Sequence, residues 1–242
     1  MKMIADKRIL ALVILNAALY VMILISDFVK IAGGVTQAQG HASDLFKYAA
    51  IVSCLFICAF SLSRPPSPER RNVARIQTIV FCFTLAADFC LLFTDYFSAG
   101  VLFFLGAHSC AILRYKPRWL IPAGISAAAL FAAIMLALPA KLHTDPGLTL
   151  VIAACSAYAI LIITVAASTF HSPQPRENEL FSRIGMILFL ACDINVAIFN
   201  GLPAGGVLHT ASTVLMWFFY LPAQTLLALS ATKLPLIARN IS

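Results

Sequence analysis

The chain has 242 residues, of which 61% are hydrophobic and only 11% are charged. Soluble domains are on average about half apolar and a quarter charged, so this composition excludes an ordinary soluble enzyme and favours a protein embedded in lipid. The formal net charge of +7 does not indicate a nucleic-acid partner, because the basic residues lie in short segments between apolar runs, where they orient a membrane protein.

Apolar runs of about 20 residues, enough to cross the hydrocarbon core of a bilayer as a helix, recur along the whole chain. Each backbone amide inside hydrocarbon needs a partner within its own segment, so these runs predict helices. We therefore predict an all-α membrane protein, an eight-transmembrane-helix bundle that forms a single transmembrane domain over residues 1–242. The predicted spans are about 9–29, 44–63, 73–94, 97–114, 119–138, 147–169, 181–200 and 210–231.

Prolines near the ends of the apolar runs are expected to end the helices there. They are Pro65, Pro66, Pro117, Pro139, Pro173 and Pro203. The first run follows Lys2, Lys7 and Arg8 as in a signal peptide, but it is too long and no small-residue cleavage site follows it. We expect it to be retained as the first helix.

The basic residues are divided unevenly between the two sides of an eight-helix bundle. Of the 17 lysines and arginines, only Lys30, Lys47 and Lys141 fall on the side opposite the termini, whereas Arg114 is among those expected in loops on the side of the termini. Because cytoplasmic loops are rich in Lys and Arg, we expect both termini to be cytoplasmic. The size and the short loops favour the inner (plasma) membrane of a bacterium.

The seven cysteines all fall within predicted spans, and none forms a CxxC pair. The sequence therefore predicts neither a disulfide framework nor a zinc site. One histidine and two distant aspartates fall short of a zinc ligand set, so no metal and no cofactor is indicated. No obligate protein partner is indicated either.

Two aspartates interrupt otherwise apolar spans: Asp88 in LAADFCLLF and Asp193 in LACDINVAIF. An aspartate at the centre of a membrane helix costs on the order of 2.5–3.5 kcal/mol, so a carboxyl at this depth is by default functional. Asp27 and Asp95 lie at helix ends, where we expect water to reach them and assign them no role.

Four further polar residues lie within spans, and the directions of those spans allow them to converge with the two aspartates in one cavity near the midplane. Each also has a structural explanation. Lys47 can extend along the helix to the interface, and His108 can bond across helices. Tyr220 can pack with a hydroxyl partner, and Gln224 can bond between helices, as is expected of Asn16, Asn195 and Tyr158.

Two carboxyls in one cavity allow one to stay protonated while the other is ionised, which gives an acid and a base side by side. Hydrolysis of an acid-labile bond requires such a pair. The chain has no serine nucleophile elbow, P-loop or HExxH motif. A second hypothesis is a non-enzymatic transporter or lipid-binding sensor that uses midplane carboxylates as proton relays.

Three segments form a more specific pattern, in which apolar and small residues recur around the polar ones. The first contains Asp88, Phe97, Gly100, Phe104 and His108; the second contains Gly185, Phe189 and Asp193; the third contains Tyr220, Ala223, Gln224 and Ser230. With Lys47 near the start of the second span, this pattern resembles the YhhN-type lysoplasmalogenases. The chain departs from the usual family residues at Ala87, Cys192, Ala111, Tyr48 and Pro222.

The resemblance implies an eight-helix membrane enzyme that hydrolyses the vinyl ether bond of lysoplasmalogens to a fatty aldehyde and glycerophosphocholine or glycerophosphoethanolamine. It implies that Asp88 and Asp193 are catalytic. Lys47, His108, Tyr220 and Gln224 would bind the lysophospholipid substrate within the lipid bilayer.

Overall fold

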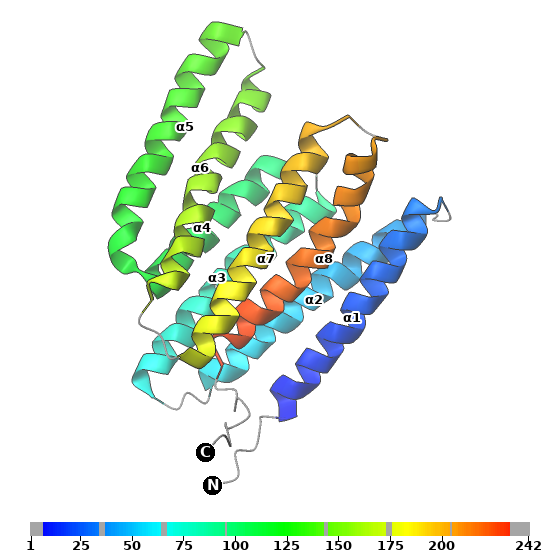
Figure 1. Cartoon of the computed structure of the whole chain (residues 1–242), viewed down its shortest axis with the longest axis vertical. Coiled ribbons are helices and arrows are strands. Elements are labelled where there is room, and N and C mark those ends of the chain that lie inside the picture. The colour runs from blue at the N-terminus through cyan, green and yellow to red at the C-terminus, as the bar shows by residue number, and fades with distance from the viewer. Residues whose placement is uncertain are drawn as a thin grey trace. The chain divides into compact units, whose positions relative to one another are not determined.

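A computed structural model describes residues 7–33, 37–63, 67–94, 96–142, 145–172, 176–203 and 205–232. Within these ranges the chain forms eight long helices and one short 3-10 helix, without strands (Figure 1). They are α1 (Lys7–Ile31), α2 (Gln37–Ser63), α3 (Pro68–Phe93), α4 (Phe97–Tyr115), η1 (Pro117–Trp119), α5 (Leu120–Leu142), α6 (Pro146–Phe170), α7 (Arg176–Gly201) and α8 (Val207–Leu229). All eight long helices are long and apolar enough to cross a bilayer, which confirms the predicted eight-helix membrane protein.

Several helices begin before their predicted spans. α2 begins at Gln37 rather than at 44, α3 at Pro68 rather than at 73, and α7 at Arg176 rather than at 181. Hydropathy marks only the part of a helix that crosses hydrocarbon, whereas the backbone hydrogen bonds continue into polar turns beyond it. The additional turns of α7, with the sequence RENEL, show this difference.

The predicted end of the fifth helix at Pro139 is wrong, because α5 continues through this proline to Leu142. A proline removes one backbone donor and crowds the preceding turn, and within membranes helices tolerate this cost where neighbouring groups satisfy the freed carbonyl. Pro65, Pro66 and Pro173 lie outside the described residues.

The chain divides into two compact units. Unit 1 comprises Met1–Arg75 and Gln174–Ser242, and thus contains α1, α2, the first turns of α3, α7 and α8. Unit 2 comprises Ile76–Pro173, and thus contains the rest of α3 together with α4, η1, α5 and α6. The single domain over residues 1–242 stays a prediction.

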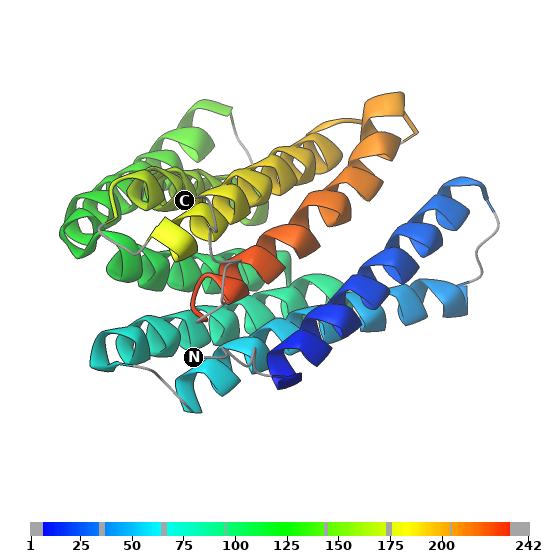
Figure 2. The same cartoon turned by 60° about the horizontal axis from the view of Figure 1, so that its bottom comes forward.

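In unit 1, α7 packs along α8, and α8 also contacts α1 and α2 (Figures 1 and 2). Gly185 permits the close approach of α7 and α8, since a Cβ atom there would lie 3.0 Å from Cγ of Leu227 and 3.2 Å from the carbonyl oxygen of Ala223. Small residues at helix interfaces allow such close packing in membranes.

A buried polar network centred on Asn16 joins three helices of unit 1. The Nδ2 atom of Asn16, on α1, donates to the carbonyl oxygen of Ala50 (2.9 Å) and to Oγ of Ser53 (2.7 Å), both on α2. Its Oδ1 atom accepts from Oγ1 of Thr225 on α8 (2.9 Å). The predicted interhelical role of Asn16 is therefore confirmed.

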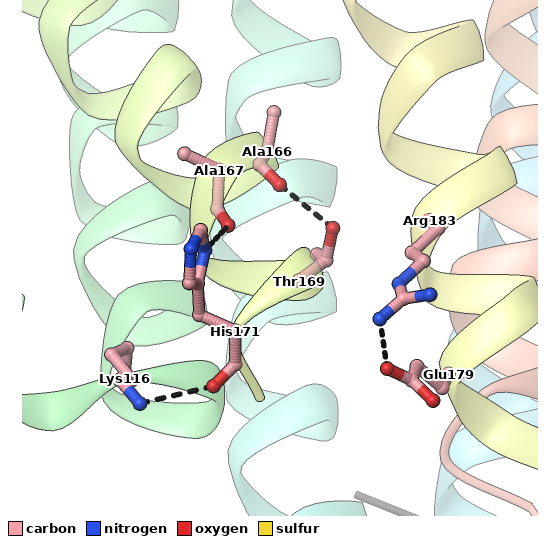
Figure 3. A network of polar contacts seen from close by, with 7 residues as sticks. All are labelled: Lys116, Ala166, Ala167, Thr169, His171, Glu179 and Arg183. Atoms are coloured by element: carbon pink, nitrogen blue, oxygen red, sulfur yellow. Dashed lines mark hydrogen bonds and ion pairs between the residues drawn. The ribbon is translucent and has the colours of Figure 1, made fainter. Parts of the chain in front are cut away.

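In unit 2, α6 packs against both α4 and α5. The α6 helix begins at Pro146, and proline is favoured at the first position of a helix. The carboxylate of the preceding residue, Asp145, caps the helix by accepting a hydrogen bond from the backbone N–H of Leu148 (3.1 Å). At the other end of α6, the ammonium of Lys116 donates to the carbonyl oxygen of His171 (3.0 Å) and ties this end to the end of α4 (Figure 3).

The α3 and α4 helices of unit 2 are antiparallel, and three pairs of residues fix their register. Gly100 lies against the carbonyl of Ala87, Gly106 lies against the ring of Phe83, and the guanidinium of Arg114 donates to Oε1 of Gln77. Arg114 is the last residue of the predicted span 97–114, but its charge was counted with the loop that follows and expected to face water there. It lies within α4 and is buried, because Gln77 supplies an acceptor below the helix end.

Large apolar side chains are exposed on helices of both units, as expected for surfaces that face lipid. Examples are Ile14 on α1, Ile121 and Leu136 on α5, and Ile194 on α7.

Candidate functional site

Asp88 lies on the buried stripe of α3. Gln77, Phe81, Thr84 and Asp88 follow one another at intervals of three and four residues, the spacing of one helix face, and all are buried. The side chain of Asp88 is only 4% exposed. Because Gln77 on this stripe bonds to Arg114, the stripe faces α4.

His108, on α4, is buried against α6. Its Nδ1 atom lies 2.8 Å from the carbonyl oxygen of Phe104, and its ring meets the ring of Tyr158 edge-on with centroids 5.0 Å apart. A carbonyl oxygen can only accept, so Nδ1 carries the hydrogen and Nε2 is the acceptor atom of the neutral ring. The structure therefore places His108 in a bond within its own helix and in an aromatic contact between helices.

Asp88 and His108 lie on the same antiparallel helix pair at different depths. The pairs Gln77 with Arg114, Phe83 with Gly106 and Ala87 with Gly100 place Asp88 level with a residue about two turns before His108 on α4. This offset corresponds to roughly 10 Å along the helix axis. Unit 2 thus presents an acid and an imidazole at two levels of one helix pair.

Asp193, on α7, is partly exposed. It follows Gly185 and Phe189 at intervals of four residues, on the side of α7 that packs against α8. Phe189 meets the ring of Tyr220 with centroids 5.5 Å apart. The contacts of Gly185 and Phe189 with α8 set a register in which Asp193 lies level with Trp217.

Lys47, near the start of the part of α2 that spans the membrane, is buried rather than extended to the interface. It is 6% exposed. Its Nζ atom lies 3.3 Å from Oδ1 of Asp27 and 3.7 Å from Oδ1 of Asp44. The same atom lies 4.7 Å from the centre of the Trp217 ring. The Lys47 ammonium is therefore held between carboxylates and an aromatic face of α8.

The expectation that water reaches Asp27 at a helix end is wrong, because Asp27 is buried and only 1% exposed. The spacing of the buried residues of α1 explains why. Asn16, Leu19, Ile23 and Asp27 recur at intervals of three and four residues and lie on one buried face. This periodicity was the signal that could have identified Asp27. Asp95 lies outside the described residues.

Tyr220 and Gln224 continue the face of α8 that begins with Trp217. The rings of Trp217 and Tyr220 are perpendicular, with centroids 5.3 Å apart. Gln224 is 2% exposed, and its Nε2 atom has no hydrogen-bond partner within the described residues. A buried donor left unsatisfied costs about 1–3 kcal/mol, so this amide is suited to donate to a bound ligand.

Four of the six predicted site residues lie in unit 1 and two lie in unit 2. In unit 1, contacts through Trp217 join Lys47 and Tyr220, with Gln224 one turn along α8 and Asp193 at the level of Trp217. Trp217 was not singled out from the sequence, although it lies one turn before Tyr220. The meeting of Asp88 with Asp193 stays a prediction. Among the described residues, no group of three or more His, Cys, Asp or Glu side chains is placed to hold a metal ion.

No curated protein and no solved structure matches the chain. The model of the YhhN family matches residues 42–231, which is most of the chain and includes all six predicted site residues. This match agrees with the eight apolar helices of a multi-pass integral membrane protein. The chain therefore belongs to the YhhN family.

Proposed function

We propose that this protein is a membrane-embedded hydrolase that cleaves the vinyl ether bond of lysoplasmalogens. The observation that carries the proposal is the YhhN family match, whose residues 42–231 include Asp88, Asp193 and the four polar residues predicted to bind substrate. The burial of Asp88 supports it, because a carboxyl kept inside an apolar helix is costly and is by default functional.

The proposed mechanism uses Asp88 and Asp193 as an acid and base pair. One aspartic acid transfers its proton to the alkenyl carbon that is not bonded to oxygen, which leaves an oxocarbenium ion. The other, ionised, stabilises this cation and removes a proton from a water molecule that adds to it, giving a hemiacetal. The hemiacetal then loses its hydroxyl proton, the bond to the glycerol oxygen breaks, and that oxygen gains a proton. The products are a fatty aldehyde and a glycerophospho-base.

The other polar residues bind and orient the substrate in this proposal. Lys47 attracts the phosphate of the headgroup, and the unsatisfied amide of Gln224 donates to a headgroup or glycerol oxygen. Tyr220 lies on α8 between Gln224 and Trp217, the ring that Lys47 contacts. The Nε2 atom of His108 orients water or the headgroup.

The orientation and location belong to the same proposal. The excess of Lys and Arg on the side of the termini supports cytoplasmic termini. The compact loops support the inner membrane of a bacterium.

The reaction is tested with purified protein and a 1-alkenyl lysophosphocholine in D₂O. Protonation of the alkenyl carbon predicts an aldehyde that carries one deuterium at carbon 2, detected by mass spectrometry. A lysolipid with a saturated 1-alkyl ether is the control and should release no aldehyde. Absence of aldehyde, together with pH-dependent solute uptake by proteoliposomes, would contradict the proposal and favour a transporter.

A further inference from the structure

The carboxylate of Asp27 is the most deeply buried acidic group in the described part of unit 1. It lies on α1 and is 1% exposed, and within the described residues no backbone N–H or neutral side chain donates to either of its oxygens. Its negative charge is balanced by two ammonium groups, since Nζ of Lys47 lies 3.3 Å and Nζ of Lys30 lies 3.8 Å from its Oδ1 atom. A buried charge is retained only where it is paired, so the pairing with Lys47 calls for an explanation.

Lys47 gains a defined position from this pairing. A lysine side chain is a point charge on a flexible four-carbon stem, and without fixed partners its ammonium samples many positions. Asp27 reaches Lys47 from α1, and Trp217 reaches it from α8. Together they fix the ammonium on the Trp217 ring, at the level along α7 and α8 where Asp193 lies.

We propose that Asp27 is a positioning residue for the headgroup site, which holds the ammonium of Lys47 over Trp217 so that it meets the phosphate of a lysolipid. The inference rests on the proposed function in one respect, that Lys47 binds phosphate. Asp27 itself does not touch the substrate; it acts through Lys47.

Asp44 differs from Asp27 in ways that make it a matched control. It also lies near the Lys47 ammonium, at 3.7 Å, but it is one turn earlier on the same helix and its side chain is 27% exposed. Because the Asp44 carboxylate is partly exposed, water screens it, and a pair one turn apart on the same helix contributes less than the fully buried contact with Asp27. Replacement of Asp44 removes the same charge from the neighbourhood of Lys47 without removing the buried contact from α1.

The test measures binding rather than turnover. The chain has two tryptophans, so W119F leaves Trp217, whose ring contacts Lys47, as the single tryptophan, which is excited selectively over tyrosine at long wavelength. In this background, emission is followed during titration with a non-hydrolysable 1-alkyl lysophosphocholine and, in parallel, with a phosphate-free 1-alkyl glycerol of the same chain length. The variants are D27N, D27E and D44N.

We expect D27N to weaken binding of the phosphate lipid at least fivefold and to leave binding of the alkyl glycerol unchanged. D27E, which keeps the carboxylate but displaces it, should weaken the phosphate lipid two- to threefold, and D44N should change it less than twofold. In turnover assays, D27N should raise KM and leave kcat unchanged.

Equal weakening of both lipids by D27N, or an effect of D44N as large as that of D27N, would overturn the proposal. Should D27N not fold, D27E decides: binding of the phosphate lipid identical to wild type contradicts the positioning role. Failure of the proposed hydrolysis would be seen separately from failure of this inference. In that case the wild-type protein would release no aldehyde, whereas the titrations would still show whether Asp27 positions Lys47.

Discussion

The ammonium of Lys47 lies 4.7 Å from the centre of the Trp217 ring, so a cation of α2 is stacked on an aromatic face of α8. Such cation–π contacts contribute about 0.5–2 kcal/mol, more where water is excluded. This contact, continued through Tyr220 to Phe189, connects the predicted headgroup-binding lysine to the helix that carries Asp193.

Replacement of Trp217 by leucine should weaken binding of a lysophosphocholine, because the ammonium of Lys47 loses the ring that holds it. The expected loss is about fivefold, equivalent to about 1 kcal/mol. W217F keeps an aromatic face and should stay within about twofold of wild type. Isothermal titration calorimetry measures both; equal affinities for W217L and wild type would exclude a role for the stacked cation.

Replacement of His108 by phenylalanine should lower turnover by roughly a hundredfold, at the lower end of what proton-transfer groups contribute. The ring contact with Tyr158 is kept, so thermal stability should change little. His171 provides the control, because its Nδ1 atom bonds to the carbonyl of Ala167 in the same way but at an exposed helix end (Figure 3). H171F should retain full turnover, and an H108F variant as active as H171F would make His108 purely structural.

A side chain at Gly185 should separate α7 from α8, since a Cβ there would lie 3.0 Å from Leu227 and 3.2 Å from the Ala223 carbonyl. Overpacking of this kind costs about 1–3 kcal/mol, so we expect G185V to lower the melting temperature measured in detergent. Gly124 on α5 has no atom within 4 Å of the corresponding position, and G124V is the matched control. Similar melting temperatures for the two variants would show that α7 and α8 are not closely packed at Gly185.

Loss of the Asn16 network should loosen α1 from α2 and α8. Interhelical polar contacts in membranes contribute about 0.6 kcal/mol on average and up to about 1.7, and N16L removes several of them, so a loss of about 1–2 kcal/mol is expected. Asn200 is exposed and donates to Val196 within its own helix, so N200L should be neutral. Unfolding in mixed micelles with increasing sodium dodecyl sulfate compares them, and an N16L midpoint equal to that of N200L would contradict the interhelical role.

The number and type of helices were predictable from the sequence because apolar length alone decides them. The helix ends were not, because RENEL in α7 and the turns before residue 44 in α2 are polar yet continue the backbone hydrogen bonds. Pro139 shows the reverse error, a residue that disfavours helix but lies inside one.

The candidate site was predictable in its residue types but not in its pairings. Lys47 and Asp27 lie on different helices, and the sequence predicts that each charge faces water at the membrane interface. Only the packing of α1 on α2 shows that the two charges pair with each other. The same holds for Arg114, whose partner Gln77 has no local signature. The meeting of Asp88 with Asp193 depends on packing far along the chain, and it stays a prediction that chemistry has to test.

The most direct measurement of the central claim is aldehyde release from lysoplasmalogen by D88N, D193N and the double variant, each purified and verified as folded. Each single replacement should lower turnover by at least about a hundredfold, and the double variant should be no worse than the more impaired single one, because residues that act as a unit are not additive. Full turnover in both D88N and D193N would contradict the aspartate pair.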